Sequence, residues 1–433
     1  MDEERFDAVV VGAGPAGSAC AYLLAKEGKE VLLVERGDSA GQKNMTGGRL
    51  YTYALEELEP GLTKRAAEAL ERPVTHEQMM LLDGDRSVSI DFADESLAGD
   101  EDGEPVSYTI MRPVFDSWLA EEAENAGAML ACGVRVDSLV REGGKVVGIK
   151  AGDDCIFADM VIAADGINSL LAQSIGLVPE LRVDGLCVGA KETVELPPDV
   201  IEQRFNCNPG EGAARLILGG VDGVNGGGII YTNQNTISFG CVLMPAALAD
   251  KRLSIADAVA KLKSHPSLAP LLANGKTVEY SAHLCGEAGL KAVPDRLGTE
   301  GFLVVGDAAG FCINQGYTVR GIDLAILSGV AAARAILEDG GSEACYRKHL
   351  SSTGVMRAME MARKFPDVED DPRIFSVYPE LACNVFDAVY RVNPSSSVTL
   401  AKKLRNCVKA STSYPKLFGD MRKVVAAINQ KER

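Results

Sequence analysis

The sequence predicts an α/β protein in which a Rossmann-like dinucleotide-binding domain is interrupted by a mostly antiparallel β domain and followed by a helical C-terminal region. Two glycine-rich turns, each between an apolar strand and a helix, lie about three hundred residues apart at 12–17 and 306–321. Between them, residues 182–285 alternate apolar and polar side chains with one helical stretch, as a sheet with one solvated face does. The two turns therefore belong to one interrupted domain.

The first turn has the composition of a dinucleotide-binding loop. Residues 6–11, FDAVVV, are short, β-branched and apolar, which predicts a buried parallel strand. GAGPAG follows and places Gly12, Gly14 and Gly17 in G-x-G-x-x-G spacing at the start of a helix. Gly12 permits the tight turn, Gly14 lets the backbone approach a pyrophosphate, and Gly17 lets helix and strand pack closely. Free N–H groups at the helix start favour the negative diphosphate.

An acidic residue follows at the end of the next strand. EVLLVER ends in Glu35 and Arg36, and the Glu35 carboxylate can accept hydrogen bonds from an adenosine ribose. Strand, helix, strand and acid in this order predict dinucleotide binding, although this fingerprint does not distinguish FAD from NAD.

Three stretches between the turns add candidate ligand contacts. The loop TGGRLY carries Gly48 and Arg49, which suit a backbone passing close to a ligand with a cation beside it. Arg112 precedes a helix whose first turn holds Pro113, and the strand DMVIAADG ends in Asp165. Taken alone, each stretch is also compatible with a surface loop, a surface arginine or a simple turn.

The second turn has the groups that the flavin half of FAD needs. GFLVVGDAAG predicts a buried strand that ends at Gly306 and Asp307, and the Asp307 carboxylate can bind a ribityl hydroxyl. GYTVRGIDLAILSGVAAARAIL then opens a long apolar helix whose N-terminal amides can face the N1–C2=O edge of a flavin. That edge gains negative charge on reduction. We therefore expect the two turns to hold opposite ends of one extended FAD.

Other features exclude several function classes. The net charge of −17 argues against a general nucleic-acid binder. The closest of the eleven cysteines are twenty positions apart, so the usual spacing of a zinc knuckle or a self-contained iron–sulfur cluster is missing and no metal site is predicted. The glycine-rich stretch 219–228 precedes a strand and predicts a hairpin connection rather than an NAD(P)H domain. None of the four histidines lies in a motif, so we name no catalytic base.

Five stretches together resemble one flavoprotein family: VVVGAGPAGSACAYLLAKEGKEVLLVERG, KNMTGGRLY, MRPVFDSWLA, AADGINS and VGDAAGFCINQGYTVRGIDLA. The sequence is similar to the electron-transfer-flavoprotein:quinone oxidoreductase family, and more narrowly to its FixC-type flavoprotein subunit. The resemblance runs from the N-terminus to about residue 365 and continues more loosely to the end. It implies a FAD-binding domain of the glutathione-reductase type.

The resemblance also implies which residues contact FAD and how the chain is divided. The implied contacts are Gly12, Gly14, Pro15, Ala16, Gly17, Glu35, Arg36, Gly48, Arg49, Arg112, Val136, Asp165, Gly166, Gly306, Asp307, Gly316, Tyr317 and Val319. The FAD-binding domain comprises residues 1–75, 111–180 and 286–365; inserted strands and an acidic loop occupy 76–110, an antiparallel substrate or quinone-side domain 181–285, and a helical basic region 366–433.

The function that the resemblance implies is electron transfer through FAD. Electrons would come from the alpha and beta subunits of an electron-transfer flavoprotein and pass towards a quinone. Longer family members carry a C-terminal four-cysteine cluster domain that this sequence lacks, which implies a separate ferredoxin-like iron–sulfur subunit. Two alternatives stay open: a geranylgeranyl-reductase-like flavin reductase of isoprenoid double bonds, and a non-catalytic flavin-bearing scaffold subunit.

The last residues differ in charge from the rest of the chain. Residues 397–433 hold nine lysines and arginines against two acidic residues. Leu400, Leu404 and Val408 recur at four-residue spacing, which predicts a helix with an apolar stripe, and Pro415 predicts a break before a shorter helix. Either this helix packs on its own domain, or it docks an acidic ferredoxin-like partner or anionic lipid. We expect a cytoplasmic protein, with peripheral contact to the cytoplasmic face of the inner membrane as the lipid-binding alternative.

Overall fold

The structure is a computed structural model and describes residues 5–99, 103–180, 185–392 and 398–429. Its first sheet has a parallel centre in the order β17-β10-β1-β2-β7, extended at one end by the short antiparallel strand β16. The bounds are β1 (Arg5–Val11), β2 (Val31–Val34), β7 (Met129–Ala131), β10 (Asp154–Ala163), β16 (Gly298–Thr299) and β17 (Phe302–Val304). A hairpin of β8 (Ser138–Glu142) and β9 (Lys145–Ala151) is attached to β10.

Helices complete the core around this sheet. α1 (Pro15–Lys26) packs against both α4 (Arg112–Asn125) and α10 (Ile322–Asp339), two helices far apart in the sequence. Phe115, Leu119 and Ala123 form the inner face of α4 and are fully buried. Thus the segments that carry the two glycine-rich turns share one apolar core, as the sequence predicts.

The second sheet is mostly antiparallel, as predicted, with the order β15-β11-β14-β13-β12-β4-β5. Its strands are β4 (Val74–Asp83), β5 (Arg86–Ala93), β11 (Leu186–Glu195), β12 (Gly212–Gly219), β13 (Gly226–Thr232), β14 (Thr236–Leu243) and β15 (Lys276–Gly286). Only the β4–β12 pair is parallel among these described strands. The antiparallel pairing of β12 with β13 confirms the hairpin connection predicted at 219–228. Residues 181–184, at the start of the predicted antiparallel domain, lie outside the described residues.

Helices accompany the second sheet in greater number than the single helical stretch predicted. They are α6 (Pro198–Phe205), α7 (Pro245–Lys251), α8 (Ile255–Ser264) and α9 (Ala269–Leu272). α6 and α7 each begin with a proline, a residue that is tolerated in the first helical turn because its missing N–H has no intrahelical partner there. A second apolar core, which includes Phe205, Phe239 and Leu262, packs between the sheet and these helices.

Short elements lie between the longer helices and strands. They are β3 (Gly48–Tyr51), which pairs with β6 (Ser107–Ile110), α2 (Tyr53–Leu58), α3 (Leu62–Arg65), η1 (Ala66–Ala69), η2 (Glu95–Ala98), α5 (Leu170–Ser174), η3 (Gly289–Ala292), η4 (Gly306–Ala309), and β18 (Ile313–Asn314), which pairs with β19 (Val319–Arg320). The β18–β19 hairpin delays the start of α10 to Ile322, later than GYTVRG suggested. The acidic stretch 93–105 holds η2, and its residues 100–102 lie outside the described part of the chain.

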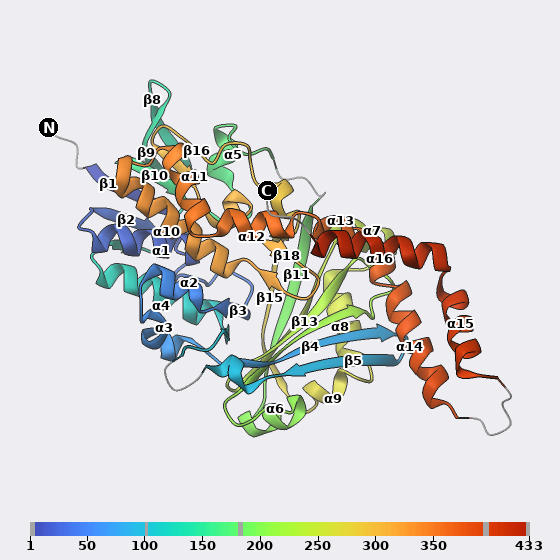
Figure 1. The fold of residues 1–433 in the computed structure, drawn as a ribbon. Helices are drawn as coiled ribbons and strands as arrows, with labels where there is room; N and C mark the ends of the chain where they lie inside the picture. The colour runs from blue at the N-terminus through green and yellow to red at the C-terminus, as the bar shows by residue number, and fades with distance from the viewer. Residues whose placement is uncertain (1–4, 100–102, 181–184, 393–397, 430–433) are drawn as a thin grey trace.

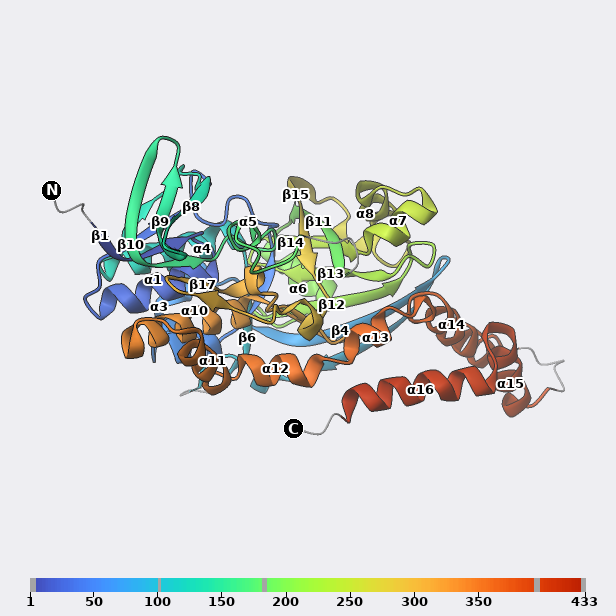
Figure 2. The same ribbon diagram turned by 90° about the horizontal axis from the view of Figure 1, so that it is seen from above.

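The chain ends in a helical arm that projects beyond the second sheet (Figures 1 and 2). After α11 (Glu343–Ser352), α12 (Val355–Ala362), α13 (Phe365–Glu369) and η5 (Pro372–Ile374), the arm consists of α14 (Val377–Tyr390), α15 (Leu400–Ser411) and α16 (Tyr414–Ile428). α14 packs on β4 and β5, α15 packs on α14, and α16 returns to α13. Among the described helices, none combines the length and the hydropathy needed to cross a bilayer.

The sequence prediction for the last helix is wrong in length. α16 spans 15 residues, whereas α15 spans 12. Pro415 stands in the first turn of α16, where it starts a helix instead of shortening one. Residue 397 and residues 430–433 of the predicted basic tail lie outside the described residues.

Candidate functional site

A cleft of about 430 Å³ lies where the two sheets meet. The carboxyl ends of β1, β2 and β10 contribute to its wall, as they do in dinucleotide-binding α/β folds. Glu35 and Arg36 mark the end of the cleft beside β2. At the other end, Lys191 and Tyr231 enter the wall from the antiparallel sheet. An extended ligand in this cleft would therefore touch both domains.

Most residues predicted to contact the cofactor lie in the wall of this cleft. These are Gly12, Gly14, Pro15, Ala16, Glu35, Arg36, Gly48, Arg49, Arg112, Val136, Asp165, Gly166, Gly306, Asp307 and Val319. Gly17, Gly316 and Tyr317 are not part of that wall. Gly17 packs inside α1, and Gly316 and Tyr317 stand at the tip of the β18–β19 hairpin.

The first glycine-rich turn fits a diphosphate closely. Gly12 has a φ of +108°, and a Cβ there would lie 2.3 Å from the carbonyl oxygen of Ala164. A Cβ on Gly17 would lie 1.9 Å from the carbonyl oxygen of Gly12, so only glycine lets α1 approach the turn. A Cβ on Gly14 would meet no protein atom within 4 Å, which leaves open space beside the backbone. No side chain caps the first N–H groups of α1, and these amides are free to bind an anion.

Glu35 joins the glycine-rich turn to the end of β2. Its Oε2 accepts a hydrogen bond from the Ala13 N–H at 3.0 Å, and its Oε1 accepts one from the Gly37 N–H at 2.6 Å. Each carboxylate oxygen can accept a second hydrogen bond. The carboxylate is therefore held by the backbone and still has acceptor capacity for ribose hydroxyls.

Two further carboxylates present polar atoms to the cleft. Asp165 Oδ2 accepts a hydrogen bond from the Leu171 N–H at 3.2 Å, whereas Oδ1 is buried and has no partner among the described residues. Burial raises the pKa of Asp165. The side chain of Asp307 faces the open cleft but lies deep between the two domains; this enclosure raises its pKa, and Arg112 partly opposes the effect. Both carboxyl groups are suited to bind hydroxyls of a cofactor.

Arg112 is fixed beside the cleft by a buried partner. Its Nε and Nη2 donate to the two oxygens of Asp116 at 2.8 and 2.7 Å, and the Asp116 side chain is fully buried. Asn44 Nδ2 donates to the same carboxylate at 3.0 Å. Burial lowers the pKa of Arg112, but the ion pair with Asp116 outweighs burial, and the net shift is upward. Asp116, which sequence reasoning missed, thus orients the predicted contact Arg112 and holds the loop that carries Asn44.

Arg49 lies in the cleft wall and has a carboxylate partner of its own. Its guanidinium forms an ion pair with the Glu77 carboxylate and donates to Ser107 Oγ at 3.0 Å. It separates the cleft from a smaller cavity of about 160 Å³, the side pocket, whose wall also contains Tyr231, Tyr317 and Val319. Arg49 therefore lies between the cleft and the side pocket with its charge already balanced.

Sequence reasoning missed several residues at the antiparallel end of the cleft. Lys191, His283, Cys285, Glu287 and Cys312 all lie in its wall. A lysine within the buried strand LCVGAKETVE was the one available signal, because lysine is depleted from such strands. The other residues come from β15 and the second turn, whose proximity depends on long-range strand pairing.

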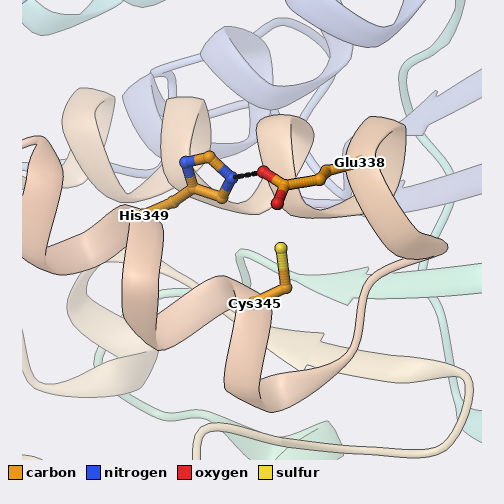
Figure 3. A group of neighbouring side chains, drawn as sticks. All are labelled: Glu338, Cys345 and His349. Carbon is orange, nitrogen blue, oxygen red and sulfur yellow. Dashed lines mark hydrogen bonds and ion pairs between the residues drawn. The ribbon is translucent and has the colours of Figure 1, made fainter.

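A separate group of possible metal ligands lies outside the cleft wall (Figure 3). Glu338 at the end of α10 and Cys345 and His349 of α11 have ligand atoms within 4.8 Å of one another. The Glu338 carboxylate binds His349 Nε2 at 2.8 Å and also Lys348 Nζ at 2.5 Å. The contact with His349 and the ion pair with Lys348 account for the arrangement as a surface network that joins two helices.

Comparison with known proteins agrees with this geometry. Residues 5–188 match the family described as "FAD binding domain". Residues 366–429, which include the arm, match the "ETF-QO/FixC family C-terminal domain". The fold resembles a geranylgeranyl bacteriochlorophyll reductase-like protein from Thermoplasma acidophilum, with a TM-score of 0.71 at 21% identity over 97% of this chain and 99% of that one.

Curated relatives cover almost the whole chain. "Protein FixC" of Escherichia coli strain K12 is 46% identical over 413 residues, which cover 93% of this chain and 95% of the relative. The "probable electron transfer flavoprotein-quinone oxidoreductase YdiS" of the same strain is 44% identical over 417 residues, 94% of this chain and 96% of the relative. "Protein FixC" of Salmonella typhimurium is 45% identical over 412 residues, 93% and 95% of the two chains.

The cleft and the comparisons identify the same cofactor. The open space beside Gly14, the uncapped amides of α1 and the unpartnered Oδ1 of Asp165 fit an extended dinucleotide. The cofactor is FAD, as predicted, and the protein is an FAD-dependent oxidoreductase linked to electron-transfer flavoproteins. The chain belongs to the ETF-QO/FixC family.

Proposed function

We propose that this protein takes electrons from an electron-transfer flavoprotein and passes them through FAD towards a quinone. The observation that carries the proposal is the cleft itself, which joins a dinucleotide-binding turn to the antiparallel sheet and adjoins a second cavity. FAD, when bound, exchanges electrons with both one- and two-electron carriers. The residues of this chain bind and orient FAD, and no acid–base residue is required of them.

The side pocket is the proposed quinone site. Met79, Ala214 and Leu216 give it apolar walls, while Gln78 and Thr318 supply polar groups that can bind a quinone carbonyl. Ile90 and Tyr317 are more than half exposed at its edge. The pocket shares Arg49, Tyr231 and Val319 with the FAD cleft, so a ring bound there would lie next to the cofactor.

A substitution that fills the side pocket tests this assignment. Leu216→Trp should slow reoxidation of the reduced protein by a short-chain quinone at least tenfold, while reduction by the electron-transfer flavoprotein keeps its rate. Val278→Trp, at an exposed position of β15, is the matched control and should behave as wild type. Equal rates of reoxidation by the quinone in all three proteins would exclude the side pocket as the quinone site. Prenyl-lipid reduction by the wild type without any quinone would instead favour the isoprenoid reductase alternative.

The arm is the proposed docking site of a separate ferredoxin-like subunit. The predicted stripe on α15 is partly covered, because Leu404 and Val408 are half-buried and α15 packs on α14. A longer stripe on α16 is exposed instead; its members, between 39% and 64% exposed, are Tyr414, Phe418, Met421, Val425 and Ile428. On the opposite side, Asp420 binds Arg373 Nε at 2.9 Å and fixes the helix to the arm.

The chemistry of α16 favours a protein partner with an acidic surface around an apolar patch. Arg422, one position beyond Met421, is exposed beside the α16 stripe and can pair with a carboxylate at the rim of such an interface. This arrangement supports the ferredoxin-like subunit of a complex that also contains the alpha and beta subunits of the electron-transfer flavoprotein. Contact with the cytoplasmic face of the inner membrane is the competing outcome, and binding to anionic vesicles in the absence of any partner would reveal it.

A further inference from the structure

Lys191 is a buried cation in the wall of the FAD cleft. It extends from β11, and its residue is only 5% exposed. Its Nζ donates to the carbonyl oxygen of Gly47 at 2.6 Å and lies 5.2 Å from the ring centroid of Tyr231. Gly240, opposite Lys191 on β14, makes room for the side chain, since a Cβ there would lie 2.7 Å from Lys191 Cγ.

The charge of Lys191 is not balanced by a carboxylate. Among the described residues, no ion pair includes Lys191, whereas Arg49 pairs with Glu77 and Arg112 pairs with Asp116. An ammonium group has three N–H donors, and one of them is used by Gly47. A buried charge without a counter-ion costs free energy. Such an arrangement is typical of a functional site rather than of a stabilising contact.

The position of Lys191 along the cleft indicates which part of the cofactor would lie next to its ammonium group. Glu35 is placed at the adenosine end, where β2 leaves the first sheet. Lys191 enters from the antiparallel sheet at the other end, near the loop that carries Gly47. An extended FAD with its adenosine at Glu35 would therefore have its flavin ring towards Lys191.

We propose that the Lys191 ammonium faces the flavin ring and stabilises the negative charge that the ring gains on reduction, which raises the reduction potential of bound FAD. The inference rests on the proposed placement of FAD in the cleft. The predicted contacts of this site bind and orient the cofactor. Lys191 would instead set the reduction potential of the cofactor. The physical effect is the attraction between a fixed cation and a developing anion in a site of low dielectric constant.

Other groups around Lys191 determine how its charge responds to pH. Arg112 from α4, His283 and Cys285 from β15, Asp307 from η4 and Tyr231 from β13 all line the same cleft. Burial lowers the pKa of Lys191 to about 8; Cys285 opposes this shift, and Arg112 adds to it. The ammonium is therefore charged at neutral pH, and a negative ring beside it would hold its proton more firmly.

The test is the reduction potential of the FAD-loaded full-length protein, measured anaerobically against a reference dye. Lys191→Met keeps the length of the side chain but removes its charge, and Lys191→Arg keeps the charge. Lys191→Met should shift the equilibrium with the dye at least tenfold towards oxidised flavin, about 30 mV for a two-electron couple. Lys191→Arg should retain most of the wild-type potential. Lys276→Met, at an exposed position of β15 in the same sheet, should match wild type.

A pH titration gives a second readout that needs no charge-removing variant. In the wild type, reduction should take up one extra proton above about pH 8, so the potential falls by an additional 30 mV or so per pH unit there. Lys191→Arg should lack this additional slope, which separates Lys191 from His283 and Cys285.

The possible results distinguish the inference from the cofactor assignment. An unchanged potential in Lys191→Met with FAD bound, together with no additional slope in the wild type, would overturn the role of Lys191 alone. If Lys191→Met does not retain FAD, the additional pH slope of the wild-type potential decides whether Lys191 has the proposed role. Failure of the wild-type protein to bind FAD would overturn the proposed cofactor site itself.

Discussion

Asp116 holds Arg112 through two hydrogen bonds, from Nε at 2.8 Å and Nη2 at 2.7 Å, at the start of α4. The carboxylate is fully buried, and the guanidinium reaches the FAD cleft. The same carboxylate binds Asn44, so one buried acid connects α4 to the loop that precedes β3. The binding site for FAD thus depends on an ion pair within a single helical turn.

Removing the charge of Asp116 should weaken both the fold and FAD binding. Asp116→Asn leaves Arg112 partly buried without a counter-ion, a change that costs on the order of 3 kcal/mol in other proteins. Urea denaturation of the FAD-free protein measures the free energy of unfolding. Asp387→Asn breaks an exposed pair of the same spacing with Arg391 and should cost less than about 0.5 kcal/mol. Equal losses in the two variants would show that the Asp116 pair has no special role.

Asp307→Ala should weaken FAD binding through a lost hydrogen bond to a ribityl hydroxyl. Such a bond contributes roughly 0.5–1.5 kcal/mol, which corresponds to about a two- to tenfold rise in the dissociation constant. Flavin fluorescence, followed as FAD is titrated into the FAD-free protein, measures that constant. Asp295→Ala, exposed on the segment before β16, serves as the control. An unchanged dissociation constant for FAD in Asp307→Ala would show that Asp307 does not bind the cofactor.

Glu369 should make the stability of the protein depend on pH. Burial raises its pKa to about 9, with a further rise from Glu287, and its Oε1 has no hydrogen-bond partner among the described residues. A carboxyl whose pKa is raised in the folded state contributes stability that is complete below its unfolded pKa, about 4.3, and is lost as pH rises towards 9. The melting temperature should therefore fall less between pH 5 and pH 9 in Glu369→Gln than in wild type.

Differential scanning calorimetry of the FAD-free protein across that pH range checks the prediction for Glu369. Glu68→Gln, which alters an exposed carboxyl on η1, should reproduce the wild-type profile. Parallel profiles for wild type and Glu369→Gln would mean that Glu369 is ionised in the folded protein.

The α16 stripe should be needed for partner binding and dispensable for folding. Phe418→Asp introduces a charge into the stripe at a side chain that is 62% exposed, and should abolish co-purification of a ferredoxin-like subunit. FAD content and melting temperature should stay unchanged because Phe418 lies outside the core clusters. Val278→Asp, at an exposed apolar position on β15, is the control. Normal binding of the ferredoxin-like subunit by Phe418→Asp would exclude the α16 stripe as its docking surface.

Local sequence signals predicted the parts of the site that are built from neighbouring residues. The order of β1, α1, β2 and Glu35 follows from short strands, glycine spacing and an acidic strand end, and the structure has that order. The tip of the β18–β19 hairpin was not predicted, because Gly316 and Tyr317 precede a helix in the sequence and two short strands leave little periodic signal. Their contact with FAD stays a prediction.

Features that depend on distant strands were beyond such signals. The parallel pairing of β4 with β12 joins segments more than a hundred residues apart, and Lys191 reaches Gly47 across 144 positions of the chain. Hydrophobic alternation shows that a strand exists, but it does not name the neighbouring strand or the ligand that its inner face meets. The stripe of α16 has a visible helical period, but only the packing of the arm shows that it is exposed along its length while the α15 stripe is partly covered.

Electron-transfer-flavoprotein-dependent quinone reduction tests the central claim most directly. The reduced alpha–beta flavoprotein is mixed anaerobically with a short-chain quinone, with or without the FAD-loaded protein, and quinol is measured by its ultraviolet absorbance. Each quinone takes up two electrons and two protons, so quinol should form in step with flavoprotein oxidation, and only when the FAD-loaded protein is present. If the flavoprotein stays reduced in that mixture while dithionite still bleaches the bound FAD, the protein does not carry electrons between these partners.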